Sequence, residues 1–393
     1  MCKRLPAAAL IALVSLLLLT GCGATEARQP RPSAYITGAT LSKEEAGQLI
    51  HFDVPAQEAG QSIGIEAHGT VAQGSLRVVL VDSAGQIAWQ AQAGPGPFAI
   101  NTVVKPEQAG RYQLGLAWDG AVTASYALAW QPGAIATTMV TPAALLGGLG
   151  MGLVAIAFVA YAARRRLGWR YLGLGAAAWV VTVACKFAWA YPANTPIYNA
   201  LHGTLPASVA GSLFYVYVGA LTGVFEVGLV WLLLRCTRLG RAGWGMALAF
   251  GIGFGAVEAL LLGLGSLASI AAALANPSAI GPDVLASLAH QNSPLYSLAP
   301  VVERVAAMGV HVFANVLVFY AVRRRQLRWF WLAFIYKTAV DSVAAFAQLW
   351  GVSTLGRLWA VEAIVIVFGV IGFWGIRRVA RAYRAAPAAP AEL

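Results

Sequence analysis

Charged residues are scarce in this sequence: Asp, Glu, Lys and Arg make up 11% of its 393 positions, whereas hydrophobic residues make up 59%. Such a low charge content excludes an ordinary soluble globular protein. A net charge of +11 would suggest nucleic-acid binding in a soluble chain, but most arginines here stand in short clusters directly after apolar runs. The composition therefore predicts an integral membrane protein whose partner is the lipid bilayer and not a nucleic acid.

Cysteine is also scarce, with four residues in the whole chain. Residues 1–21 have a basic start and a short apolar core, and the following LTGC ending resembles a bacterial lipobox. This resemblance implies cleavage before Cys22 and lipidation of its thiol, with an ordinary signal peptide or membrane anchor as the alternative. Cys185 and Cys236 lie in or beside apolar runs, and Cys2 belongs to the signal. No disulfide framework is therefore expected in the exported part.

Long apolar runs are missing between residues 22 and 135, where apolar and polar residues alternate instead. The alternation is clearest at Leu76, Val78 and Leu80, at Tyr112, Leu114, Leu116 and Trp118, and at Tyr126, Leu128 and Trp130. Period-two patterns separated by turn residues predict roughly seven or eight short strands, which fit an exported all-β sandwich. We expect its two histidines, His51 and His68, at the surface. This domain is a candidate for binding an envelope ligand, although its fold does not indicate a function.

Residues 136–384 contain apolar runs long enough to cross a bilayer as helices. The predicted spans are 139–162, 169–191, 208–234, 243–273, 298–322, 329–350 and 356–376. They predict an all-α bundle of seven transmembrane helices, followed by a disordered cytoplasmic tail at 385–393.

Lysine and arginine are absent from two connections between spans, which we expect to be loops: PANTPIYNALHGTLPAS and NPSAIGPDVLASLAHQNSP. Arginine clusters instead follow the first, third, fifth and seventh spans. The positive-inside rule places these clusters in the cytoplasm and the β domain outside the bacterial inner membrane. The tail offers no output domain, which argues against a self-contained signalling receptor. The absence of an internal repeat argues against a transporter.

Ionisable residues inside the spans are costly and therefore mark candidate functional sites. They are Lys186, Glu226, Glu258, His311, Lys337, Asp341 and Glu362. At about 1.5 Å per residue, several lie at similar depths. His311 and Asn315 are four residues apart and share one helical face. The structural alternative is a set of buried ion pairs, Lys337 with Glu226 and Lys186 with Glu258, together with a Glu303–Arg304 pair at the outer end of the fifth span.

Four segments carry a family resemblance: GVFEVGLVWLLLR, GIGFGAVEALLLG, ERVAAMGVHVFANVLVFYAV and YKTAVDSVAAF. Their order and setting resemble the YhfC-type family of intramembrane metalloproteases, which is distantly related to the CAAX prenyl protease and PrsW superfamily. The resemblance implies hydrolysis of a peptide bond in a membrane-associated protein or peptide.

The resemblance also implies roles for individual residues. Glu226 would be the general base, His311 with Asn315 would stabilise the oxyanion, and Glu258 with Asp341 would orient the site. If a metal is present, zinc is the candidate and Glu258, His311 and Asp341 are its candidate ligands.

The sequence departs from the family pattern at four positions. Val227 and Val230 stand in place of Glu and Arg, and Phe254 and Lys337 stand where histidines are expected. A zinc site would then consist of His311 and carboxylates, an unusual ligand set for that metal. Two alternatives therefore stay open beside the zinc enzyme. One is hydrolysis without a metal, and the other is a non-catalytic membrane sensor or scaffold whose exported domain binds an envelope ligand.

Overall fold

The computed structural model describes residues 33–41, 47–57, 59–132, 140–277, 280–352 and 354–384. The predicted signal and lipidation site at 1–21 and Cys22, and the predicted tail at 385–393, lie outside these residues.

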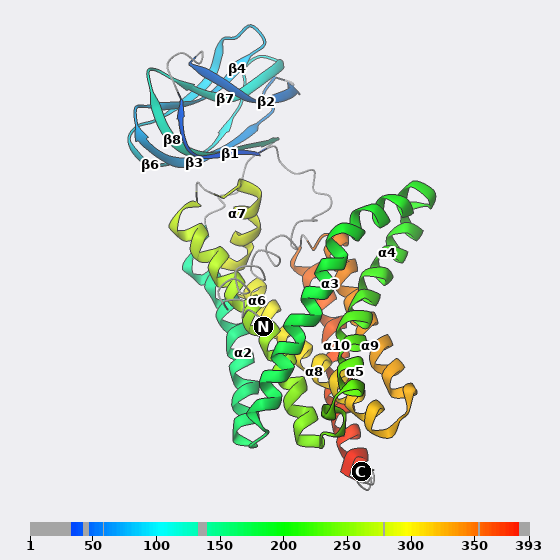
Figure 1. Ribbon diagram of the computed structural model, residues 1–393. Coiled ribbons are helices and arrows are strands. Elements are labelled where there is room, and N and C mark those ends of the chain that lie inside the picture. Colours follow the sequence, from blue (N-terminus) through cyan, green and yellow to red (C-terminus); the bar gives the residue numbers. More distant parts are fainter. Residues whose placement is uncertain are drawn as a thin grey trace, which may run out of the picture. The chain divides into compact units, whose positions relative to one another are not determined.

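Two four-stranded antiparallel sheets form the N-terminal domain (Figure 1). The strands in the described residues are β1 (Ser33–Leu41), β2 (Gln48–Gln57), β3 (Ile63–Gln73), β4 (Leu76–Asp82), β5 (Ile87–Ala93), β6 (Gly96–Val104), β7 (Gly110–Trp118) and β8 (Val122–Pro132). Their order is β1-β8-β3-β6 in one sheet and β2-β7-β4-β5 in the other. The all-β prediction for this region is confirmed.

One apolar core is shared by the two sheets, and it is built from the alternating residues of the sequence. Val78 of β4 pairs with Leu116 of β7, and Leu80 pairs with Leu114. Each of these four side chains is at most 1% exposed. Their alternation therefore places every second residue in the core, as the period of a strand requires.

The two histidines of this domain are less exposed than the sequence suggested. His68 of β3 is 9% exposed, and His51 of β2 is half-buried with its Nε2 2.7 Å from the hydroxyl of Tyr126. Burial lowers the pKa of His51 and raises the pKa of Tyr126 to about 12. The prediction that both histidines lie at the surface was wrong. It relied on the small number of other metal-binding residue types in this domain, which does not indicate which face of a strand a histidine occupies.

Seven helices among the described residues are long and apolar enough to cross a membrane. These segments are Pro142–Arg164, Trp169–Thr204, Ala207–Cys236, Trp244–Ala275, Pro294–Arg324, Leu327–Gln348 and Leu355–Tyr383. They correspond to α2 (Leu145–Arg164, after the short helix η1, Pro142–Ala144), α3 (Trp169–Thr204), α4 (Ala207–Thr222) with η2 (Gly223–Gly228) and α5 (Leu229–Cys236), α6 (Trp244–Ala275), α8 (Pro294–Arg324), α9 (Leu327–Trp350) and α10 (Leu355–Arg384). The seven-span prediction is confirmed.

The two connections predicted as loops are largely helical. Helix α3 continues through Pro192 and Pro196 to Thr204, and the rings of Tyr198 and His202 stack one turn apart with centroids 3.9 Å apart. The second connection contains α7 (Pro282–Ala289) and η5 (His290–Asn292). Elsewhere, the short helix η3 (Arg238–Arg241) follows α5. Loss of hydrophobicity marked where a bilayer span would end, but it did not mark where the helix ends.

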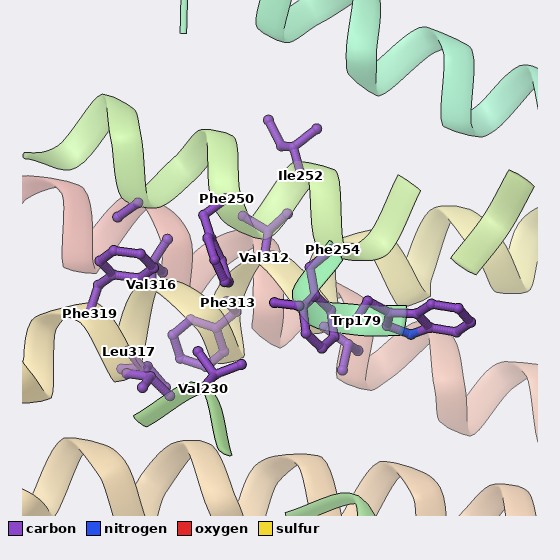
Figure 2. Packing of buried hydrophobic residues seen from close by; sticks show 14 of the residues in the cluster. Trp179, Val230, Phe250, Ile252, Phe254, Val312, Phe313, Val316, Leu317 and Phe319 are labelled. Carbon is purple, nitrogen blue, oxygen red and sulfur yellow. The ribbon is translucent and has the colours of Figure 1, made fainter. Parts of the chain in front are cut away.

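Helix α8 is the central helix of the membrane bundle. The most apolar 18-residue window of this helix is 83% buried, compared with 28% for the first span. Phe250 of α6 packs edge-to-face against Phe319 of α8, with centroids 5.2 Å apart (Figure 2). In the same helix, a Cβ added at Gly253 would lie 2.0 Å from the backbone oxygen of Leu172 in α3. Small residues thus let α6 approach its neighbours closely.

Candidate active site

A π-helical turn, η2, carries the most deeply buried carboxylate of the bundle. It interrupts the α4–α5 span at Gly223–Gly228 and holds Glu226, which is 4% exposed. Single π-turns inside α-helices are rare and are frequent at functional sites. Close contact also requires glycine here, because a Cβ on Gly223 would lie 2.6 Å from Oγ1 of Thr338 in α9. The turn therefore brings Glu226 up against α9.

Two ammonium groups neutralise Glu226. Its Oε1 lies 2.7 Å from Nζ of Lys186 in α3, and its Oε2 lies 3.3 Å from Nζ of Lys337 in α9. Lys337 also lies 3.3 Å from Oδ2 of Asp341, one turn along α9. The predicted Lys337–Glu226 pair is confirmed, but the predicted Lys186–Glu258 pair is wrong. Depth estimated along a span cannot tell which neighbouring helix a side chain faces, and Lys186 faces η2.

Glu258 of α6 is held by three other groups. It accepts hydrogen bonds from Nε1 of Trp179 at 2.8 Å and from Arg304 at 2.5 Å, and its Oε2 lies 2.8 Å from Nε2 of His311. Arg304 also pairs with Glu303, as the sequence predicted. The contacts of Glu258 with Trp179 and Arg304 were not predicted. The presence of Arg304 in an otherwise apolar segment is a signal that could have identified the second contact.

The orientation of His311 follows from its bond to Glu258. An ionised carboxylate only accepts hydrogen bonds, so Nε2 of His311 carries the hydrogen, and in a neutral imidazole Nδ1 then keeps its lone pair. Nδ1 lies 4.0 Å from Oε2 of Glu226. Both atoms are buried. Within the described residues Nδ1 has no hydrogen-bond partner, whereas Oε2 has the contact with Lys337 at 3.3 Å. Asn315 donates from Nδ2 to the backbone oxygen of His311 at 2.9 Å, which joins the two residues of this helical face.

Glu226 and His311 both line a small cavity. Its lining includes Glu226, Phe254, His311, Asn315 and Lys337, and its volume of about 10 Å³ is close to the minimum that admits one water molecule. The ring of Phe254 closes one side, with its centroid 5.5 Å from that of His311. The site thus has two acceptors, one ammonium group and space for a single water.

The structure brings together four of the five predicted catalytic residues directly: Glu226, Glu258, His311 and Asn315. Asp341 is linked to this group by its ion pair with Lys337. Of the other ionisable residues in the spans, Glu362 of α10 is 7% exposed, and no contact joins it to the cavity in the described part of the chain. We refer to Lys186, Glu226, Glu258, Arg304, His311 and Lys337 as the polar centre.

The side chains of the polar centre do not fit a metal ion. No group of three or more His, Cys, Asp or Glu side chains within the described ranges is arranged to hold one. The carboxylates Glu226 and Glu258 instead contact lysine and arginine, and such cations would repel a metal ion bound to the same oxygens. His311 is the one imidazole among the cavity-lining residues. The mixture of donors therefore favours a metal-free centre.

A comparison with models of protein families gives a match. A family model described as YhfC intramembrane metalloprotease matches residues 150–365, which is more than half of the chain. This segment contains every residue of the polar centre and excludes both sheets of the N-terminal domain. No curated protein matches the sequence. On the extent of the family match, together with its membrane helices, the chain belongs to the YhfC intramembrane metalloprotease family.

Proposed function

We propose that this protein hydrolyses a peptide bond in a membrane-associated protein or peptide, with a water molecule held between Glu226 and His311 as the nucleophile. One observation carries the proposal. Nδ1 of His311 is buried without a hydrogen-bond partner among the described residues. It lies 4.0 Å from the buried Oε2 of Glu226, which Lys337 contacts at 3.3 Å, and both residues line a cavity with room for one water. Buried polar atoms without partners are rare and commonly mark an ordered water or a catalytic role.

The arrangement favours attack by such a water. It would donate one hydrogen to Glu226 and one to His311, which leaves its lone pairs free for the carbonyl carbon of a substrate. We assign the proton to His311, because two ammonium groups already compensate the charge of Glu226. Glu258 would stabilise the imidazolium formed, as the carboxylate of a catalytic triad does. His311 would then return the proton to the leaving amine.

The negative charge that develops on the substrate oxygen needs a donor. Lys337 lines the same cavity and carries an ammonium group, so we assign oxyanion stabilisation to it. Asp341 would hold Lys337 in place, and Asn315 would hold the backbone of His311. The role first predicted for His311 with Asn315 therefore passes to Lys337, while Glu258 keeps its orienting role.

We place the protein in the bacterial inner membrane, with the two-sheet domain outside and the C-terminus in the cytoplasm. Arginine clusters lie at the C-terminal ends of α2, α5, α8 and α10, each of which ends an odd-numbered span. In a bundle of alternating helices these ends lie on one side, and positive charge favours the cytoplasmic side. The two-sheet domain would then recruit or gate substrates from outside.

Cleavage can be tested with the purified protein in vesicles of phosphatidylethanolamine and phosphatidylglycerol. The substrates are a mixture of synthetic single-span peptides, and fragments are identified by mass spectrometry. We expect His311→Gln and Glu226→Gln to reduce cleavage at least 100-fold while thermal unfolding still shows a folded protein. His202→Gln is the matched control, since His202 bonds to the backbone of Tyr198 and lies outside the polar centre. Unchanged cleavage in both site variants would refute the proposal.

A non-catalytic sensor or scaffold is the second candidate, and a different observation favours it. Glu226 and Glu258 are both paired with cations, as expected of a structural ion-pair network. The wild type would then release no fragments from any peptide, and an envelope ligand would bind to the two-sheet domain. Cleavage that depends on His311 would exclude this candidate.

A further inference from the structure

The cavity of the polar centre is lined by side chains from three different helices. Phe254 comes from α6, His311 from α8 and Lys337 from α9, and all three line it together with Glu226 of η2. Of the three, His311 is the one that can give a lone pair to a metal ion, because phenylalanine has no donor atom and a lysine ammonium has no free lone pair. Three helices therefore meet at this cavity, but two of these three side chains cannot bind a cation.

The positive charge at this point is supplied by the chain itself. Nζ of Lys186 and Nζ of Lys337 lie 2.7 and 3.3 Å from the two oxygens of Glu226. Neither lysine is far from its partner carboxylate, and both are largely buried, with side chains 21% and 5% exposed. A buried carboxylate needs a compensating charge, and two ammonium groups supply the same charge as one divalent ion.

One half of a metal-binding arrangement is nevertheless present. Nε2 of His311 is 2.8 Å from Glu258, while Nδ1 lies 4.0 Å from Oε2 of Glu226, the other charged carboxylate beside the cavity that His311 lines. A carboxylate on the outer nitrogen of a histidine is the arrangement that orients histidine ligands toward metals. Trp179 and Arg304 hold Glu258 in turn, so His311 is fixed in this orientation.

We infer that the ammonium groups of Lys186 and Lys337 take the place of a metal ion, so that this member of the family has no resident metal. A corollary follows from the geometry. Replacing Lys186 with an uncharged residue and placing imidazoles at positions 254 and 337 would convert the same cavity into a zinc site, with His311 and Glu226 as further ligands. The inference does not depend on catalysis, since it concerns only what occupies the centre.

The test measures metal content. The full-length protein is purified in detergent with an affinity tag that contains no histidine, incubated with zinc, desalted and analysed by mass spectrometry. We expect less than about 0.1 zinc per chain in the wild type and at least a tenfold increase in the variant Lys186→Met/Phe254→His/Lys337→His. The matched control, Lys186→Met/Phe254→Leu/Lys337→Met, removes the same charges without adding donors and should bind as little zinc as the wild type.

Two outcomes would overturn the inference. One is near-stoichiometric metal in the wild type that is lost in His311→Ala. The other is a folded Lys186→Met/Phe254→His/Lys337→His variant that binds no more zinc than its control. If that variant does not fold, thermal unfolding of the wild type with and without a chelator decides, because a resident metal would raise the unfolding temperature. Peptide cleavage is not part of these measurements, so the proposed hydrolysis can fail while the metal-free centre stands, or the reverse.

Discussion

Replacing Lys186 with methionine tests whether the ion pairs at Glu226 hold the bundle together. The pair is short, 2.7 Å from Nζ to Oε1, and Glu226 has a side chain only 3% exposed. At an effective dielectric constant of about 20, the Coulomb energy at this distance is about 6 kcal/mol. Removing one partner of a buried pair typically costs about 3–5 kcal/mol, and we expect the lower end because Lys337 still contacts Glu226.

The assay is thermal unfolding in detergent, followed by tryptophan fluorescence. A loss of about 3 kcal/mol should lower Tm by roughly 6–12 °C, at about 2–4 °C per kcal/mol for a domain of this size. The double variant Lys186→Met/Glu226→Gln should lose less stability than the two single variants together, because the uncompensated charge is gone. The control, Lys105→Met, changes an exposed lysine and should shift stability by less than about 0.5 kcal/mol. A Tm decrease below about 2 °C for Lys186→Met would refute the assigned role of the pair.

Two further predictions concern packing and pH. Gly253→Ala should destabilise the bundle by about 1–3 kcal/mol, because the added Cβ would lie 2.0 Å from the backbone oxygen of Leu172; Gly265→Ala, which meets nothing within 4 Å, is the control in the same helix. Equal thermal stability of the two variants would contradict the close packing of α3 and α6. The N-terminal domain should lose stability as the pH falls below about 6.5, the pKa of an unperturbed histidine. Burial lowers the pKa of His51 in the folded protein, so the unfolded chain binds the proton more readily than the folded one. The difference in unfolding temperature between pH 7.5 and pH 5.5 should be smaller for the full-length His51→Gln variant than for the wild type. An equal difference in the two proteins would contradict a contribution of His51 to the pH dependence.

The overall fold could be predicted because it depends on hydrophobic periodicity. Runs of about twenty apolar residues identify helices in a bilayer, and alternation such as Leu114 and Leu116 identifies strands with one buried face. Helix ends were predicted less well, since the α3 segment beyond Pro192 is too polar to resemble a span and is nevertheless helical.

The candidate site could be predicted in its members but not in its pairing. Ionisable residues stand out in apolar spans, which is why Glu226, Glu258 and His311 were identified. Which of them touch depends on helix rotation, and the π-turn at Gly223–Gly228 changes that rotation without any signal in the sequence. Lys186 was consequently assigned to Glu258, although it contacts Glu226.

The size of the cavity has a kinetic consequence. With space for about one water molecule, the cavity of the polar centre is too small for a peptide backbone. If the proposed hydrolysis takes place in this cavity, a substrate would enter only after a transient separation of α6, α8 and α9, a kind of motion that occurs on the microsecond to millisecond timescale. Substrate entry would then depend on this separation, so cleavage should respond to the thickness and lateral pressure of the surrounding bilayer.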